Sequence, residues 1–271
     1  MKVAQIQMKV SKDKEETKKR VEKFIEDIRN ENVDLVCLGE MFDCPYDINL
    51  FHSYAEKEGG DIYNFLSNIA EKYKVYLSAG SISELDGNSV YNTAYVFDRD
   101  GNKIAKHRKM HLFDIDIKGG QSFKESETLT AGNQITTFNT EFGKMGLCIC
   151  YDFRFPELSR LMTLDGAKVI LVPASFNLTT GPSHWQTMFK SQALNNQVFV
   201  IGTSPARDMK ASYKSYGHSI ITDPWGEIVS ELDSKEGIMI KNLDLTKIDE
   251  IREQLPLLKH RREDIYTICK R

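Results

Sequence analysis

The feature that most constrains the fold of this chain is the alternation of short apolar runs with amphipathic segments. The runs VDLVCL at 33–38 and KVILVP at 168–173 each contain a single charged residue. Strands of this kind are covered on both faces, as they are in parallel sheets flanked by helices. The sequence therefore predicts an α/β protein.

Amphipathic helices are expected between such strands. Asp13 stands where a helix N-cap is expected, after a first strand that carries Val3, Ile6 and Met8. Two apolar helix faces follow, formed by Val21, Phe24, Ile25 and Ile28 and by Ile62, Phe65, Leu66, Ile69 and Tyr73. The strand–helix–strand order predicts a right-handed parallel unit.

The turn at 86–88, Asp-Gly-Asn, predicts an antiparallel hairpin. A second half then repeats the strands and helices, and Pro156 and Pro182 are expected to open its two helices. Residues 110–133 show little periodicity and are expected to form a long functional loop. The other predicted strands are VYLSAGSIS, SVYNTAYVF, GNKIAKHRK, QITTFNT, GKMGLCI, VFVIGTS, SYGHSIIT, GEIVSEL and GIMIKNL.

No low-complexity linker divides the chain, so we expect one α/β domain over residues 1–271. Its two halves would contain similar elements. The tail at about 256–271 is expected to be an extended arm that packs on a neighbour or a partner subunit.

Composition excludes several classes of function. A net charge of −3 with dispersed Lys and Arg residues gives no basic field for nucleic acid. No window approaches the roughly 20 apolar residues of a membrane span, and the N-terminus has no targeting segment, so we expect a cytoplasmic protein. Five scattered cysteines make a disulfide framework or a zinc site improbable. No phosphate-binding glycine motif is present, so no cofactor is expected.

Three polar residues stand just past the ends of predicted strands. Glu40 follows VDLVCLG, Lys109 follows GNKIAKHR, and Cys150 follows GKMGLCI. Ligands bind at the carboxyl ends of strands in open α/β sheets, so three separate segments would deliver these side chains to one pocket.

The segments around these residues, LGEMFDCPY, HRKMHLFD and MGLCICYDFRFPEL, resemble the three signatures of the nitrilase superfamily of carbon-nitrogen hydrolases. Their order and separations also match over nearly the full length. The resemblance implies a four-layer α-β-β-α sandwich, a homo-oligomer, most often a dimer, and a catalytic set of Glu40, Lys109 and Cys150. It also suggests a second active-site carboxylate at Glu125.

The chemistry of amide hydrolysis requires these residue types. A cysteine thiolate attacks the carbonyl, and Glu40 would take the thiol proton and pass it to ammonia. The Lys109 ammonium and the backbone N–H of Tyr151 would stabilise the oxyanion. A buried lysine tends to lose its proton, so Lys109 needs Glu40 and Glu125 nearby to remain charged.

The two neighbouring cysteines are expected to differ. A straight strand would point Cys148 and Cys150 to one face, but a sharp turn at Tyr151-Asp152 would expose only the second. We therefore predict Cys150 as the nucleophile and Cys148 as a packing residue.

The segments SFNLTTGPSHW, SPARDMKASYKSYGHS, HLFDID and DPWGE resemble the omega-amidase branch, which hydrolyses 2-oxoglutaramate and 2-oxosuccinamate. Arg154 is expected to bind the free carboxylate of such a substrate, with hydroxyls from Tyr46 and Thr180. Phe176 is a candidate pocket wall, although such aromatics usually belong to a core. Arg154 has a structural alternative, an ion pair with Asp152 or Glu157.

Several other functions stay open from the sequence. His107 and His111 could bind zinc if they lay on a helix, and His111 or His184 could activate Cys150 in a papain-like dyad. Within the superfamily, a deaminated glutathione amidase is the second candidate. A non-catalytic interaction protein that keeps the fold is the candidate from another class.

Overall fold

The computed structural model describes residues 1–119 and 121–270 of the chain. Its first half, together with β15 from near the C-terminus, forms a seven-stranded sheet in the order β15-β1-β2-β3-β5-β4, with β6 also paired to β5. These strands are β1 (Lys2–Gln7), β2 (Leu35–Cys37), β3 (Tyr76–Ser78), β4 (Ile82–Asp86), β5 (Ser89–Phe97), β6 (Lys103–Arg108) and β15 (Gly237–Asn242). Strands β1, β2 and β3 are parallel, whereas β15 pairs with β1 antiparallel.

The second half forms a six-stranded sheet in the order β14-β13-β12-β11-β10-β9. Its strands are β9 (Thr136–Thr140), β10 (Gly143–Leu147), β11 (Val169–Pro173), β12 (Phe199–Thr203), β13 (Ile220–Thr222) and β14 (Ile228–Glu231). Strands β10, β11 and β12 are parallel, as in the centre of the first sheet. The two halves thus repeat one arrangement.

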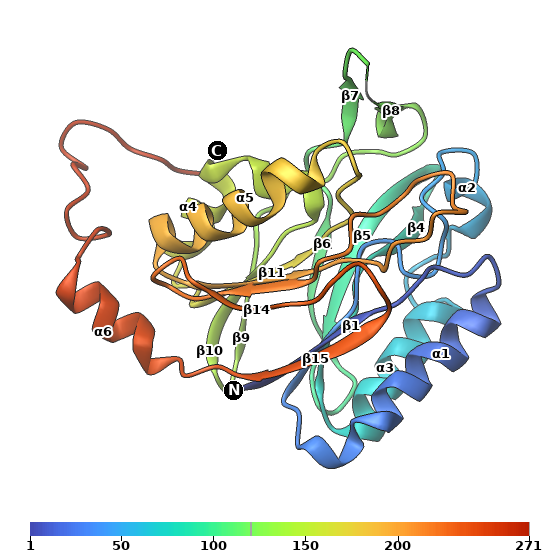
Figure 1. The fold of residues 1–271 in the computed structure, drawn as a ribbon, viewed down its shortest axis with the longest axis horizontal. Helices are drawn as coiled ribbons and strands as arrows, with labels where there is room; N and C mark the ends of the chain where they lie inside the picture. Colours follow the sequence, from blue (N-terminus) through green and yellow to red (C-terminus); the bar gives the residue numbers. More distant parts are fainter. Residues whose placement is uncertain (120, 271) are drawn as a thin grey trace.

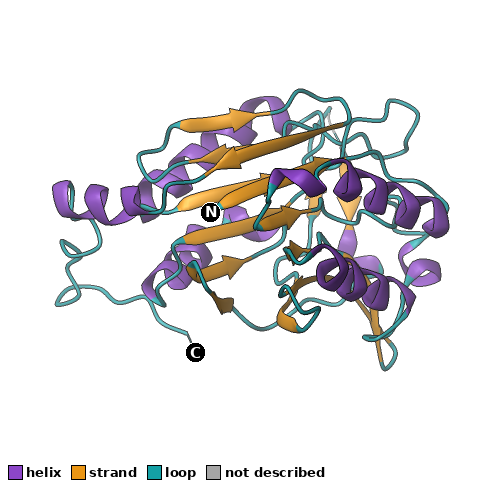
Figure 2. Cartoon of the chain, turned by 90° about the horizontal axis from the view of Figure 1, so that it is seen from below, coloured by secondary structure: helices purple, strands orange, loops and turns teal. Residues whose placement is uncertain are grey.

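Helices cover the outer faces of the two sheets, which pack against each other (Figures 1 and 2). Helices α1 (Lys14–Asp27) and α3 (Asp61–Tyr73) lie on the first sheet, and α4 (Pro156–Leu164) and α5 (Gly181–Asn196) lie on the second. The predicted α-β-β-α sandwich is therefore confirmed. Asp13 caps α1 as predicted, since its carboxylate accepts hydrogen bonds from the N–H groups of Glu15 and Glu16.

The alternation of side chains explains why the short β2 run is apolar throughout. Leu35 and Cys37 belong to the core cluster between the sheets, whereas Val36 and Leu38 belong to the cluster beneath α1 and α3. Successive residues of a strand point to opposite faces, so both faces of β2 must be apolar.

Two buried glutamines join the sheets. The amide of Gln5 donates to the carbonyl of Gly202 at 2.7 Å, and that of Gln7 donates to the carbonyls of Asp233 and Lys235 at 2.7 and 2.6 Å. Because buried amides without partners are costly, these bonds fix how the two sheets sit on one another.

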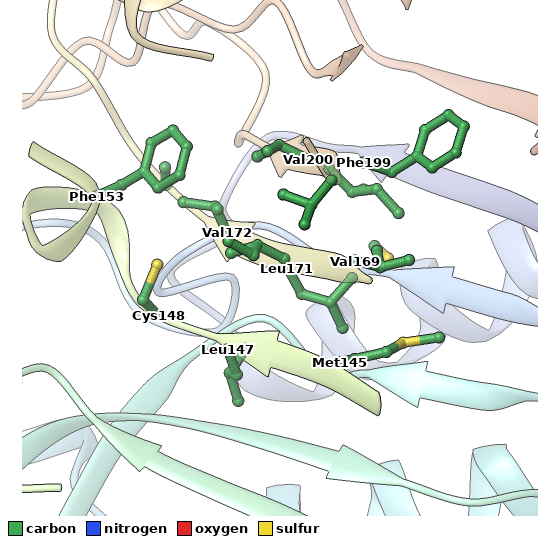
Figure 3. Packing of buried hydrophobic residues seen from close by; sticks show 14 of the residues in the cluster. Met145, Leu147, Cys148, Phe153, Val169, Leu171, Val172, Phe199 and Val200 are labelled. Atoms are coloured by element: carbon green, nitrogen blue, oxygen red, sulfur yellow. The ribbon is translucent and has the colours of Figure 1, made fainter. Parts of the chain in front are cut away.

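The core of the second half surrounds β10 and β11. Cys148 lies in it among Leu147, Leu171 and Phe153 and is fully buried (Figure 3). It is therefore a packing residue, as the sequence predicts.

Two predictions about secondary structure differ from the structure. The segment VYLSAGSIS breaks into β3 and β4 at Gly80, whose φ of +62° lets it lie against the carbonyl of Gly39. Residues 110–133 contain a two-stranded hairpin, β7 (Asp114–Asp116) and β8 (Ser122–Lys124), and the 3₁₀ turn η2 (Glu125–Glu127). These strands are too short to show periodicity.

Other helical elements also lack a sequence signal. Helix α6 (Thr246–Gln254) has one buried residue, Ile248, and therefore no apolar stripe. The short helix α2 (Phe51–Tyr54) and the turns η1 (Arg29–Glu31) and η3 (Cys150–Arg154) complete the helical elements of the described ranges.

The segment after α6 contains neither helix nor strand in residues 256–270 (Figure 2), while Arg271 lies outside the described residues. It passes beside α4 of the same chain (Figure 1), where burial and the nearby charge of Arg261 lower the pKa of Arg160. Ile265 and Tyr266 are exposed. None of the described helices is both long enough and apolar enough to cross a membrane.

Candidate active site

Cys150 lies at a tight turn between the second sheet and α4. Strand β10 ends at Leu147, and η3 begins at Cys150, which has a φ of +47°. The sharp turn therefore comes at Cys150 itself, one residue before the predicted position. Both cysteines are buried, and Cys150 is 5% exposed, so the expected contrast in exposure is small.

Glu40 and Lys109 reach the site from the first sheet. Glu40 follows β2 and Lys109 follows β6, and both side chains are fully buried. The Lys109 ammonium donates to Glu40 Oε1 at 3.0 Å and to Glu125 Oε1 at 2.9 Å. It also donates to the hydroxyl of Tyr46 at 3.0 Å. The structure thus brings together the lysine and both predicted carboxylates.

Glu125 has further contacts that fix it. It begins η2, just after β8, and its Oε2 accepts from the N–H of Phe113 at 2.7 Å. Its Oε1 also accepts from the Tyr46 hydroxyl, which lies within hydrogen-bond distance of Glu40 as well.

These charges decide the protonation of Lys109. Burial alone would lower the pKa of Lys109, but the charges of Glu125 and Glu40 outweigh it and raise that pKa. Burial raises the pKa of Glu40, the Lys109 charge opposes this rise, and the Glu125 charge adds to it. The ammonium is therefore charged, and Glu40 takes up a proton more readily than an exposed carboxylate.

The thiol of Cys150 faces Glu40 and the backbone of Ser175. Burial and the Glu40 charge raise the pKa of the Cys150 thiol, while Lys109 acts in the opposite direction. The thiol is therefore protonated at rest, and a base must remove its proton before it attacks. Glu40 is the carboxylate that lies beside it.

Three residues that position Glu40 were not predicted from the sequence. Asn92 Nδ2 donates to Glu40 Oε1 at 2.9 Å, and the N–H of Ser175 donates to Oε2 at 2.8 Å. The hydroxyl of the buried Tyr213 donates to the carbonyl of Ser175 at 2.6 Å. Because Ser175 lies 135 residues from Glu40, no local pattern indicates this contact.

Arg154 ends η3 and lies against aromatic rings. Its guanidinium carbon is 4.5 Å from the ring centre of Phe176, and one nitrogen is 3.0 Å from Nδ1 of His184. Burial lowers the pKa of Arg154. None of its partners in the described ranges is a carboxylate: Asp152 binds histidines instead, and Glu157 is exposed on α4. The alternative ion pair with Asp152 or Glu157 is therefore absent from the described ranges.

The hydroxyls expected to assist Arg154 are already used. The Tyr46 hydroxyl lies within hydrogen-bond distance of the carboxylates of Glu40 and Glu125 and can donate its one proton to either of them, and the Thr180 hydroxyl donates to Asn177 Oδ1 at 3.0 Å. Both hydroxyl protons therefore have partners within the protein in this arrangement. A hydrogen bond from either residue to a substrate carboxylate stays a prediction.

Phe176, the predicted pocket wall, lies in the core cluster around β10 and β11. Phe176 packs edge-on against Trp185 in the core, with ring centres 5.0 Å apart, and its face meets Arg154. The Tyr151 ring packs against Phe113 and Phe155. Its backbone N–H is the first after Cys150.

The histidines have other partners. His107 and His111 bind Asp152 at 2.9 and 2.7 Å, and His184 binds Arg154. Residues 1–119 and 121–270 contain no group of three His, Cys, Asp or Glu side chains arranged to hold a metal. The geometry therefore favours Glu40, rather than a histidine, as the partner of Cys150.

A cavity of about 580 Å³ reaches the Glu40 side of this site. Tyr46, Ser175 and Tyr213 line its inner end, and Lys12 and Lys210 lie among its other lining residues. Of the proposed catalytic residues, Glu40 is the one that lines this cavity.

Comparison with known proteins identifies the class to which this fold and site belong. Residues 2–253 match the family model of the carbon-nitrogen hydrolases, so the chain belongs to that family and is a carbon-nitrogen hydrolase. The nitrilase-superfamily resemblance is thereby confirmed.

Particular relatives refine this assignment. The chain is similar to omega-amidase NIT2 of Mus musculus, with 43% identity over 98% of this chain and 96% of the relative. NIT2 of Homo sapiens is 42% identical over the same shares. Among solved structures, Saccharomyces cerevisiae Nit3, a member of branch 10 of the nitrilase superfamily, superposes with a TM-score of 0.89 and 42% identity, covering 97% of this chain and 96% of Nit3.

Proposed function

We propose that this protein is an omega-amidase that hydrolyses the terminal amide of small dicarboxylate monoamides such as 2-oxoglutaramate and 2-oxosuccinamate. The products are the dicarboxylate and ammonia. The observation that carries the proposal is Arg154, a cation beside the nucleophile turn whose described neighbours include no carboxylate. A half-buried cation without a carboxylate partner favours an anionic ligand. The similarity to the NIT2 omega-amidases supports the same substrate class.

Acylation begins at Cys150. Glu40 takes the thiol proton while sulfur attacks the amide carbon, so a C–S bond forms as the carbonyl π bond opens. The three ammonium protons of Lys109 already go to Glu40, Tyr46 and Glu125, so Lys109 stabilises the oxyanion chiefly through its charge. The direct hydrogen bond comes from the N–H of Tyr151.

Collapse of the tetrahedral intermediate breaks the C–N bond. Glu40 passes its proton to the departing nitrogen, and ammonia leaves a thioester on Cys150. Water then attacks the thioester after giving a proton to Glu40, and the carboxylic acid leaves as the thiol is reprotonated. Asn92 and Ser175 hold the Glu40 carboxylate in one orientation through both half-reactions.

Glu125 supports this cycle without exchanging protons with substrate. Its Oε1 binds Lys109 and Tyr46, and its Oε2 is held by the N–H of Phe113. It therefore keeps Lys109 charged and in place when Glu40 is neutralised by the thiol proton.

Arg154 binds the far end of the substrate. Its guanidinium provides a planar fork of N–H donors for a carboxylate, while Phe176 supports its face. The hydroxyls of Thr180 and Tyr46 remain candidate donors to that carboxylate.

A substrate panel tests the proposal. We expect kcat/KM to be highest for 2-oxoglutaramate, lower for succinamate, and at least about 10²-fold lower for deaminated glutathione and a simple nitrile. Hydroxylamine added to the reaction should yield the hydroxamate of each substrate, which reports the acyl-enzyme. Preference for deaminated glutathione would contradict the substrate assignment, and absence of any hydroxamate would favour a non-catalytic role.

We further propose a single-domain homodimer that acts in the cytoplasm. Five free cysteines, four of them buried, suit a reducing compartment. Trp225 and Leu194 are exposed apolar side chains, at 50% and 39%, and the backbone of Gly226, next to Trp225, lies against Leu194. Light scattering should give twice the mass of the chain, and Trp225→Glu should shift it to one chain. A monomeric parent protein would contradict the dimer.

A further inference from the structure

Asp152 is a buried carboxylate that the mechanism above does not use. It lies two residues after Cys150 in η3, and its exposed fraction is 0%. A buried carboxylate is costly unless several donors surround it, so its partners indicate what it does.

Five donors meet the two oxygens of Asp152. Oδ1 accepts from the N–H of His111 at 2.8 Å, from His111 Nδ1 at 2.7 Å and from the N–H of Met110 at 3.1 Å. Oδ2 accepts from His107 Nε2 at 2.9 Å and from the N–H of Ile149 at 3.1 Å. This carboxylate therefore has its acceptor capacity filled.

These donors come from both sides of the active site. His107, Met110 and His111 flank Lys109 at the end of β6, which belongs to the seven-stranded sheet. Ile149 immediately precedes Cys150, at the end of β10 in the six-stranded sheet. A single side chain thus joins the segment that carries the ammonium to the turn that carries the nucleophile.

Asp152 also closes the turn around Cys150. Its N–H donates to the carbonyl of Ile149 at 2.9 Å, while its Oδ2 accepts from the N–H of the same residue. Cys150, between them, has the left-handed φ of +47°, which residues with side chains rarely adopt. The surrounding bonds therefore hold a conformation that the free chain would leave.

The rings that bind Asp152 are themselves fixed. His107 Nδ1 lies 3.0 Å from the hydroxyl of Thr136, which donates to the carbonyl of Lys106 at 3.2 Å. The His111 ring stacks on Phe155 with ring centres 3.7 Å apart. Burial would raise the pKa of Asp152, but hydrogen bonds from both histidines outweigh it and lower that pKa. The carboxylate is therefore ionised at neutral pH.

We propose that Asp152 is a positioning residue that sets the separation between the Lys109 ammonium and the oxyanion-binding N–H of Tyr151. The rings of His107 and His111 support it. This inference rests on the catalytic roles proposed for Lys109, Cys150 and Tyr151, and it adds a role for a residue that touches none of the reacting atoms.

The role predicts a specific kinetic signature. A misplacement of about 1 Å in a catalytic group costs on the order of 10²-fold in rate. Arg154, which would bind the substrate carboxylate, has no hydrogen bond to Asp152. Substitution of Asp152 should therefore leave the binding of the substrate in its ground state intact. The substitution should therefore lower kcat and leave KM nearly unchanged.

The test compares three variants on whichever amide of the substrate panel the parent enzyme hydrolyses fastest. Asp152→Asn should lower kcat by about 10²-fold and change KM by less than about threefold. His111→Ala keeps the main-chain donor and should lower kcat by roughly fivefold to tenfold. Asp165→Asn, a control at an exposed carboxylate at the end of α4, should match the parent enzyme.

Each outcome decides the proposal. A folded Asp152→Asn enzyme with kcat within about threefold of the parent would overturn it, as would a rise in KM that accounts for the whole loss. If Asp152→Asn does not fold, His111→Ala decides: an unchanged kcat overturns the proposal, and the expected fall supports it. Failure of the proposed catalytic set is distinguishable, because it would appear as activity remaining in Cys150→Ala.

Discussion

The two cations of the active site, the buried Lys109 and the half-buried Arg154, differ in what surrounds them. Lys109, from the first sheet, has two carboxylates within hydrogen-bond distance. Arg154, from the turn before α4, has aromatic faces, a methionine sulfur and a histidine. One cation has its counter-ions inside the protein, whereas the other meets no carboxylate among the described residues.

The difference assigns a part of the reaction to each cation. A cation with two fixed counter-ions keeps its charge and position before and after substrate binds, which suits stabilisation of a transition state. A cation without a counter-ion gains most from an anionic ligand, which suits recognition. The catalytic end and the recognition end of the site are thus set by where the protein provides carboxylates.

The largest expected effect lies at the nucleophile, between the two cations. Cys150→Ala should lower kcat by about 10⁴-fold or more, because the acyl-enzyme cannot form. Cys148→Ala removes the other cysteine from the packed core and should reduce stability by about 1 kcal/mol while leaving kcat nearly unchanged. Steady-state kinetics and urea unfolding measure both. Substantial turnover by Cys150→Ala would refute the assignment.

Removing the paired cation comes next. Lys109→Met should lower kcat by on the order of 10³-fold, because the oxyanion loses its positive charge. It should also destabilise the fold by about 3 kcal/mol, since Glu40 and Glu125 would face each other without a cation. Lys106→Met, on the same strand but paired with Glu58 and Glu84, is the matched control. A Lys109 variant with normal kcat would instead favour a Cys-His dyad.

Removing the charge of Glu125, one of the two counter-ions of Lys109, should lower kcat by less than removing Lys109 does, and it should also shift the pH dependence of kcat/KM. Glu125→Gln should lower kcat by about 10²-fold. The charge of Glu125 raises the pKa of Glu40, and Glu40 must be ionised to accept the thiol proton. Activity of the parent is lost as pH falls through that raised pKa, so the acid limb of kcat/KM should move to lower pH in the variant. Glu127→Gln is the exposed control, and an unmoved limb would contradict the coupling.

Another buried carboxylate, Asp43, extends the comparison to stability. Among the described residues its ion-pair partner is the ammonium of Lys14, at 3.9 Å, and burial raises the pKa of Asp43 from 3.8 to about 7. A raised carboxyl pKa stabilises the fold below about pH 4, and this contribution is lost as pH rises from about 4 to 7. The effect amounts to at most about 4 kcal/mol.

Urea unfolding of Asp43→Asn tests this sign. The parent should lose stability relative to the variant as the pH is raised from about 4 to 7, and the two curves should then run parallel. Asp165→Asn, at an exposed site, should reproduce the parent curve. Equal pH dependence in the parent and in Asp43→Asn would show that Asp43 does not titrate in this range.

The parts that could be predicted are those with local signals. The periodicity of apolar residues predicts the strands that are covered on both faces and the amphipathic helices. Glu40, Lys109 and Cys150 stand just past the ends of strands, within motifs that resemble those of the family. These positions follow from the chain's own alternation of apolar and polar residues.

The remaining parts depend on contacts between distant segments. Ser175 binds Glu40 through its main-chain N–H. Because every residue except proline has this group, the residue type at 175 does not predict the contact. The Tyr46 hydroxyl lies against Glu125, 79 residues further along the chain, and no local pattern indicates that contact. The turn at Cys150 also depends on Asp152, whose donors lie about 40 residues earlier in the chain.

The most direct test of the central contrast is the dependence of the Arg154→Ala variant on substrate charge. Succinamate and butyramide share the amide and chain length, but only succinamate has a carboxylate. We predict that kcat/KM for succinamate falls by about 10²-fold, mainly through KM, while the value for butyramide changes by less than about threefold. Equal losses on both amides, or an unchanged KM for succinamate, would contradict the assignment of Arg154 to the substrate carboxylate.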